Sequence, residues 1–145
     1  MAHPVTWFQI SGKDGGRLQT FYKDVFSWRI KPSVDGMVGM VSPDKPGGIG
    51  GGVGASRDGN PNVAVYVNVK NLNEQLQKVE AAGGRRAMDP IELPGGMGAI
   101  AGFLDPEGNW VGIWQPAKKA PKPPARKAAK KRPAAKVKRK AAKRR

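Results

Sequence analysis

The segment VYVNVKNLNEQLQKVEAAGG, residues 65–84, decides the fold because its hydrophobic period changes part-way along. Valines recur at every second position from 63 to 69, which is the period of a strand with one face for burial and one that can line something. Asn71 then suits a helix N-terminus, and apolar residues at helical spacing follow up to Val79. Gly83 and Gly84 end the helix. The segment therefore predicts a strand that leads directly into an amphipathic helix.

The first part of the chain has the same order. The β-branched and aromatic run VTWFQI, residues 5–10, predicts a strand. Asp14 is a plausible N-cap. Apolar residues recur at helical spacing from Leu18 to Phe26, which predicts a helix of about three turns. Each half of the chain thus begins with a strand and a helix.

Further strand candidates complete both halves. In the first half they are residues 28–31 and 37–41, followed by a Gly-rich strand or bulge within 47–56; in the second they are 87–93, 99–104 and 109–115. Each half has the order β-α-β-β-β, and neither half could easily bury its helix alone. The predicted fold class is α+β, with two similar βαβββ modules that share one core.

The charge of the chain is concentrated at its C-terminal end. The 145 residues include 26 Lys or Arg and 11 Asp or Glu, a formal net charge of +15. Residues 1–116 contain eleven of each sign, whereas residues 117–145 contain fifteen Lys or Arg and no acid. We therefore expect a folded domain over residues 1–116. Residues 117–145 should form a tail that is disordered in isolation, because it has almost no apolar side chain to bury.

The composition of the tail, mainly Lys, Arg, Ala and Pro, is similar to that of linker-histone C-terminal tails. Its cations would displace counterions from nucleic acid, so we expect non-specific binding to DNA or RNA. Without an aromatic residue it offers no base stacking. A solubility tail or an anionic membrane surface are the alternatives, the second weakened by the lack of a hydrophobic anchor. The candidate nucleic-acid-binding residues are Lys118, Lys119, Lys122, Arg126, Lys127, Lys130, Lys131, Arg132, Lys136, Lys138, Arg139, Lys140, Lys143, Arg144 and Arg145.

The N-terminus has neither a charged region nor an apolar region of a secretory signal, and no apolar run approaches ~18 residues. We expect a cytoplasmic protein without a membrane partner, associated with the nucleoid in a bacterium or located in the nucleus in a eukaryote. The chain has no cysteine, which excludes disulfides and thiolate chemistry. Its only histidine, His3, is close to the N-terminus, so a Ser-His-Asp arrangement is not expected.

Three stretches resemble the vicinal oxygen chelate superfamily, which includes glyoxalase I, bleomycin resistance proteins and extradiol dioxygenases. They are WFQISGKDGGRLQTFYKDVFSW at 7–28, VYVNVKNLNEQLQKVEAAGG at 65–84 and FLDPEGNWVGIWQ at 103–115. The resemblance implies a curled, cup-like mixed sheet, in which each module forms half of the cup and the helices lie on its outer face. It also implies a divalent metal where the halves meet, held by His, Glu or Gln side chains at inward-facing strand positions.

The metal ligands of that superfamily fall on unsuitable residues here. The resemblance places the His of the first strand on Trp7, the matching His of the second module near Ala64, and the Glu of the last strand on Gly112. None of these side chains can coordinate a metal. We therefore expect no family-type metal site, no cofactor and no catalytic residue, which favours a binding protein over an enzyme. The alternative is a metal-dependent lyase or dioxygenase whose ligands lie elsewhere.

Strand alternation predicts a cup lined by aromatic and amide side chains, without charge. Such a lining suits a small, planar, largely apolar ligand that is held by stacking and oriented by hydrogen bonds. The alternatives are that these aromatics only pack in the fold, or that they form a contact between subunits, and we expect a homodimer. The candidate ligand-binding residues are Trp7, Gln9, Tyr66, Asn68, Trp110 and Trp114.

Overall fold

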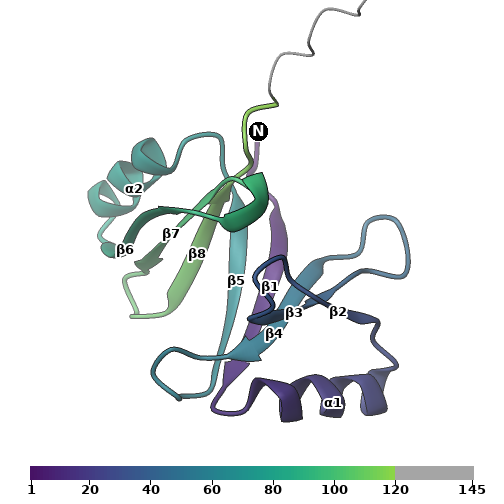
Figure 1. Ribbon diagram of the computed structural model, residues 1–145. Coiled ribbons are helices and arrows are strands. Elements are labelled where there is room, and N and C mark those ends of the chain that lie inside the picture. Colours follow the sequence, from purple (N-terminus) through teal and green to yellow (C-terminus); the bar gives the residue numbers. More distant parts are fainter. Residues whose placement is uncertain (120–145) are drawn as a thin grey trace, which may run out of the picture.

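The computed structural model describes residues 1–119, which form two α-helices and one eight-stranded mixed sheet (Figure 1). The predicted order β-α-β-β-β occurs twice. The first module comprises β1 (Val5–Gly12), α1 (Gly15–Phe26), β2 (Ile30–Pro32), β3 (Val38–Val41) and β4 (Gly50–Ala55); the second comprises β5 (Asn62–Asn68), α2 (Leu72–Ala81), β6 (Arg85–Glu92), β7 (Ala99–Leu104) and β8 (Trp110–Gln115). The predicted α+β fold class is confirmed. Of the candidate nucleic-acid-binding residues, all except Lys118 and Lys119 lie outside the described residues.

The strand order in the sheet is β2-β3-β4-β1-β5-β8-β7-β6. Within each module the first strand is parallel to the last: β1 pairs with β4, and β5 pairs with β8. The antiparallel pair of β1 and β5 joins the modules into one sheet. Figure 1 shows β1 and β5 in the middle, with the two helices at opposite ends of the molecule. The inner face of the sheet therefore receives side chains from both modules.

Both helices begin at the predicted caps. The Arg17 N–H donates to Asp14 Oδ1 over 2.9 Å, and the Glu74 N–H donates to Asn71 Oδ1 over 3.1 Å. These side chains satisfy backbone donors that have no partner inside the helix. Helix α2 buries Leu72, which packs in the core of the second module. The other buried members of that core are Val69, Leu76, Ala101 and Ile113.

Helix α1 differs from α2 in that none of its residues is buried. Its first turn lies against β4, where a Cβ on Gly15 would come within 2.6 Å of the Ala55 nitrogen. Further along, Tyr22 stacks on Trp28 with ring centroids 5.1 Å apart. Trp28 also packs against Phe8 of β1. Strand β2 begins at Ile30, later than predicted.

The prediction that the valine face of the central strand is buried is wrong for the first half of β5. Val63 is 71% exposed and Val65 is 42% exposed, whereas Val69 just beyond the strand is 2% exposed. Helix α1 packs mainly against β4 and β1, and α2 mainly against β6, β7 and β8, so neither covers this part of β5. Among the described helices, none has the length and apolar character needed to cross a membrane.

Candidate ligand-binding cavity

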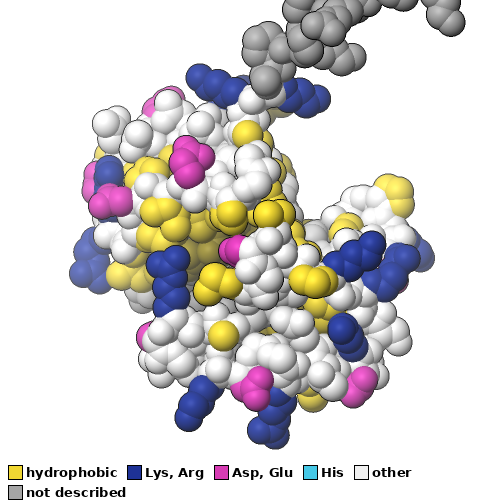
Figure 2. Space-filling view, viewed as in Figure 1, with side chains coloured by type: hydrophobic (Ala, Val, Ile, Leu, Met, Phe, Trp, Pro, Cys, Tyr) yellow, Lys and Arg dark blue, Asp and Glu magenta, His cyan; other side chains and the backbone are white. Residues whose placement is uncertain are grey.

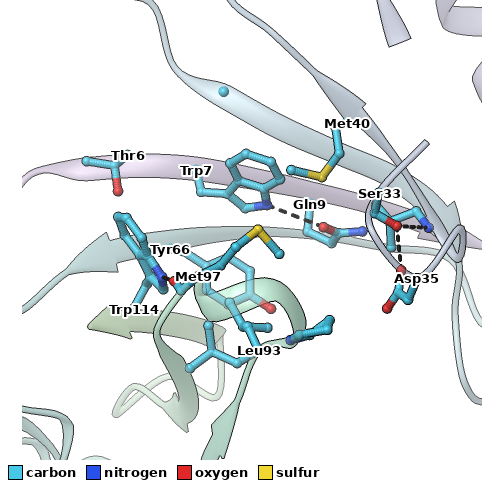
Figure 3. Close-up of a pocket in the computed structure, with 14 residues that line it drawn as sticks. Thr6, Trp7, Gln9, Ser33, Asp35, Met40, Tyr66, Leu93, Met97 and Trp114 are labelled. Atoms are coloured by element: carbon cyan, nitrogen blue, oxygen red, sulfur yellow. Dashed lines mark hydrogen bonds between the residues drawn. The ribbon is translucent and has the colours of Figure 1, made fainter. Parts of the chain in front are cut away.

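A cavity of about 500 Å³ lies on the inner face of the sheet, with residues of both modules in its wall (Figure 3). Figure 2 shows hydrophobic side chains gathered in the hollow between the modules. A volume of this size is within the range of small-molecule sites. The apolar and aromatic residues in the wall include Trp7, Met40, Tyr66, Met97, Ile100 and Trp114, and the polar side chains in it are Thr6, Gln9, Ser33 and Asp35.

The structure places four of the six candidate ligand-binding residues in this wall, namely Trp7, Gln9, Tyr66 and Trp114. The other two are outside it. Trp110 packs edge-on against Tyr66 with ring centroids 5.8 Å apart, so it contacts a ring of the wall without lining the cavity itself. Asn68 is the last residue of β5, and its N–H donates to the Pro4 carbonyl over 2.8 Å. Strand alternation does not show how far along each strand the cavity extends.

Glycines on neighbouring strands lie beneath the inward-facing rings. Gly50 is opposite Trp7 in the register of β1 and β4, and a Cβ there would be 3.2 Å from the indole. Gly112 is opposite Tyr66 in the register of β5 and β8, and a Cβ there would overlap the phenol ring. The absence of a side chain at Gly112 thus makes room for Tyr66 rather than for a ligand.

Hydrogen bonds fix the orientation of two indoles in the wall. Trp7 Nε1 donates to Gln9 Oε1 over 3.4 Å, and Trp114 Nε1 donates to the Met97 carbonyl over 2.8 Å (Figure 3). Because both indole N–H groups already have acceptors, what the tryptophans offer to a ligand is aromatic surface. Gln9 uses its carbonyl oxygen on Trp7 and offers its NH₂ group as a donor.

Thr6 enters the wall through a β-bulge that sequence alternation did not predict. The register of β1 and β5 shifts between Val5 and Trp7, which leaves Thr6 without a paired residue on β5. Bulges redirect side chains and are common next to binding sites. Thr6 Oγ1 is buried and has no hydrogen-bond partner within residues 1–119. A buried hydroxyl left unpaired costs roughly 1–3 kcal/mol of stability.

Two turns cover the cavity, one from each module. The β2–β3 turn contributes Ser33 and Asp35, and the β6–β7 connection contributes residues that include Met97. The turns touch each other, since a Cβ on Gly95 would be 3.2 Å from Val34 Cγ2. The sequence analysis predicted the strands on either side of both turns but missed the lining residues in the turns, because the period of a strand does not show over which face a turn folds.

The cavity carries one charged side chain, which corrects the prediction of an uncharged cup. Asp35 Oδ1 accepts hydrogen bonds from Ser33 Oγ and from the Met37 N–H, the latter over 3.1 Å. These bonds hold the pKa of the Asp35 carboxyl below its ordinary value, the bond from Ser33 having the larger effect. Burial raises the pKa of the Tyr66 phenol, and the nearby Arg57 guanidinium opposes that shift. At neutral pH Asp35 is therefore anionic and Tyr66 is neutral.

The residues at the superfamily's metal-ligand positions do not fit a divalent cation. Trp7 and Ala64 carry no suitable donor, and Gly112 is covered by the Tyr66 ring. Within residues 1–119, no three His, Cys, Asp or Glu side chains come together as a metal site requires. Asp35 contributes one carboxylate, which does not make a coordination sphere.

Residues 5–113 match the model of the Glyoxalase/Bleomycin resistance protein/Dioxygenase superfamily. The chain belongs to this superfamily. No curated protein matches it. Among solved structures, a hypothetical protein from Bacillus halodurans C-125 is 12% identical with a TM-score of 0.60, over 83% of this chain and 99% of that one.

Two further solved structures show the same fold. Methylmalonyl-CoA epimerase from Mycobacterium tuberculosis is 15% identical with a TM-score of 0.56, over 79% of this chain and 89% of that one. A glyoxalase/bleomycin resistance protein/dioxygenase superfamily member from Vibrio splendidus 12B01 is 17% identical with a TM-score of 0.53, over 79% and 99%. At such identities the likeness concerns the fold, and activities differ widely among proteins that share one.

Proposed function

We propose that this superfamily member binds a small, largely apolar or aromatic molecule in its cavity, without a divalent metal. The observation that carries the proposal is a cavity of about 500 Å³ whose wall is mostly aromatic and apolar and holds a few polar side chains. A few polar groups in a mostly apolar cavity are typical of small-molecule sites, where they orient the ligand. The donor set in the wall favours a binding protein over a metal-dependent lyase or dioxygenase.

Stacking would supply much of the affinity. Trp7 and Trp114 are held in place through their indole nitrogens, so their orientation needs little further ordering when a ligand enters. Rigid aromatic surfaces of this kind lower the entropic cost of binding. The Tyr66 ring, fixed between Gly112 and Trp110, provides a third rigid surface from the second module.

Calorimetric titration of the full chain with 2-naphthylmethanol, a neutral aromatic probe, tests this proposal. We expect saturable binding that is weakened about fivefold to tenfold by Trp7→Leu, because a stacking partner is lost. Trp28→Leu is the matched control, since Trp28 lies in the aromatic cluster beside α1 and not in the wall of the cavity. No binding by the full chain, or an equal loss in both variants, would contradict the proposal.

We also propose that the tail tethers the domain to nucleic acid. The support is the separation of charge, with fifteen Lys or Arg and no acid in residues 117–145 beside a neutral remainder. If about half of these cations contact phosphates, the logarithm of the binding constant falls with the logarithm of salt at a slope of about −6 to −7 on B-DNA.

The test compares DNA retention by the full chain with that of a version ending at Pro116. We expect the full chain to be retained at low salt and the shortened chain to pass through, because the latter has no net charge. Equal retention of both would refute the tethering proposal. The homodimer and the localisation stay predictions.

A further inference from the structure

We propose that the ligand is a lipophilic cation, a flat apolar or aromatic molecule whose protonated amine or quaternary ammonium group lies beside Asp35. This inference rests on the proposed ligand binding in the cavity and specifies the chemical class of the ligand. It depends on the charge of the wall, on the hydrogen bonds of Asp35 and on the aromatic groups elsewhere in the wall.

The first argument is the charge of the wall. Asp35 is the only side chain ionised at neutral pH among the residues that line the cavity, which include no Lys, Arg or His. An anionic ligand would place its charge near this carboxylate with no cationic group in the wall to offset the repulsion. A cationic ligand gains attraction instead, so the wall discriminates between the two signs of charge.

The second argument is the use of the carboxylate oxygens. Asp35 accepts both of its hydrogen bonds, from Ser33 and Met37, through Oδ1. Figure 3 shows Asp35 bonded to Ser33 at one end of the cavity. Oδ2 accepts no hydrogen bond within the described part of the chain and is left for a ligand. The turn thus fixes the position of the carboxylate while one oxygen remains available.

Two other turn aspartates provide the comparison. Asp58 receives the Asn60 N–H on Oδ1 and the Asn60 side-chain amide on Oδ2. Asp105 uses both of its oxygens on Asn109 in the same way. Asp58 and Asp105 each stabilise a turn and accept hydrogen bonds through both carboxylate oxygens. Asp35 differs from them in its unengaged oxygen and in its place in the wall of the cavity.

The third argument is the surface that surrounds the ligand. Trp7, Tyr66 and Trp114 line the cavity, and their ring faces attract cations. Both indole N–H groups are engaged elsewhere, so they do not compete as donors against a cationic ligand. Met40 and Met97 add polarizable thioethers that adapt to flat apolar groups.

The experiment uses three probes with one ring system: 2-naphthylmethylamine, which is cationic at neutral pH, neutral 2-naphthylmethanol and anionic 2-naphthoate. Each is titrated calorimetrically into the full chain. We expect the amine to bind up to about fivefold tighter than the alcohol, from an exposed ion pair between its ammonium group and Asp35. The carboxylate should bind most weakly.

Asp35→Asn retains Oδ1 as the acceptor for Ser33 and Met37 and removes the charge. It should bring the affinity of the amine to that of the alcohol and leave the affinity of the alcohol unchanged. Asp58→Asn, a change of the same type at a turn outside the cavity, should leave the preference for the amine intact.

The outcomes separate this inference from the proposed function. Equal binding of all three probes, or a preference for the amine that survives Asp35→Asn, would overturn the cationic class while the cavity remains a ligand site. Tightest binding of the carboxylate would also overturn it. Binding of none of the probes would refute ligand binding and the cationic class together.

Discussion

Replacing Gly112 by alanine tests whether this glycine makes room for Tyr66. A methyl group at position 112 would overlap ring atoms Cδ1 and Cε1 of Tyr66. It would lie 2.7 Å from Cγ, well inside the 3.4 Å at which ordinary contact begins. The ring cannot move freely, because Trp110 packs against it. Gly112→Ala must therefore strain the wall of the cavity or displace the ring.

Overpacking of this kind costs about 1–3 kcal/mol of unfolding free energy. In a Tyr66→Ala background the obstacle is gone. Gly112 has no positive φ, so alanine can adopt its backbone conformation. In the Tyr66→Ala background, Gly112→Ala should therefore raise the unfolding free energy by about 0.4–1 kcal/mol, because it lowers the conformational entropy of the unfolded chain. The two substitutions should then be coupled by about 1.5–4 kcal/mol in a double-mutant cycle.

Urea unfolding followed by circular dichroism, on the wild type, both single variants and the double variant, measures this coupling. Gly16→Ala is the control for the general effect of such a change. Its new Cβ would be 3.6 Å from Asp14 Oδ1, an ordinary contact, and it should cause no loss of stability. If Gly112→Ala changed the unfolding free energy equally in the wild-type and Tyr66→Ala backgrounds, the statement that Gly112 makes room for Tyr66 would be refuted.

Three further predictions concern polar groups in and near the site. Thr6→Val should raise the unfolding free energy by about 1 kcal/mol in urea titrations, because it removes a buried hydroxyl without a partner; a loss of stability would show that the hydroxyl is satisfied. The folded-state pKa of Tyr66 is raised, so the unfolded state loses this proton first and stability falls as pH rises above about 10. Tyr66→Phe should reduce that fall between pH 9 and pH 11, and an unchanged fall in this variant would contradict the prediction. Hydrogen bonds from the Asn109 side chain and backbone lower the pKa of Asp105, so its contribution to stability is present above about pH 4 and is lost as pH falls through the folded-state pKa. Asp105→Asn should flatten the acid side of the stability profile, and an unchanged profile would contradict this.

The fold could be predicted because two hydrophobic periods follow one another in each half of the chain. The strand period before Asn71 and the helical period after it place β5 and α2 without any tertiary information. The exposure of Val63 could not be predicted in this way, since it depends on how far each helix extends over the sheet.

The lining residues of the cavity could be predicted only where they belong to regular strands. Trp7 and Tyr66 alternate inward, and the structure places both in the wall. Thr6 was missed because a bulge breaks the alternation, and Asp35 was missed because it belongs to a turn. The resemblance singles out Gly112 as the position of an absent metal ligand. In the structure, the contact that explains this glycine is with the Tyr66 ring on a neighbouring strand.

The most direct test of the central claim is an NMR titration of the four tryptophan indole N–H resonances with 2-naphthylmethylamine, in the presence of a chelator. Trp7 and Trp114 line the cavity, whereas Trp28 and Trp110 do not, so the protein contains its own controls. We predict saturable shifts for the first pair, a smaller shift for Trp110 through its contact with Tyr66, and none for Trp28. Shifts centred on Trp28, or shifts that require an added divalent cation, would contradict metal-free binding in the cavity.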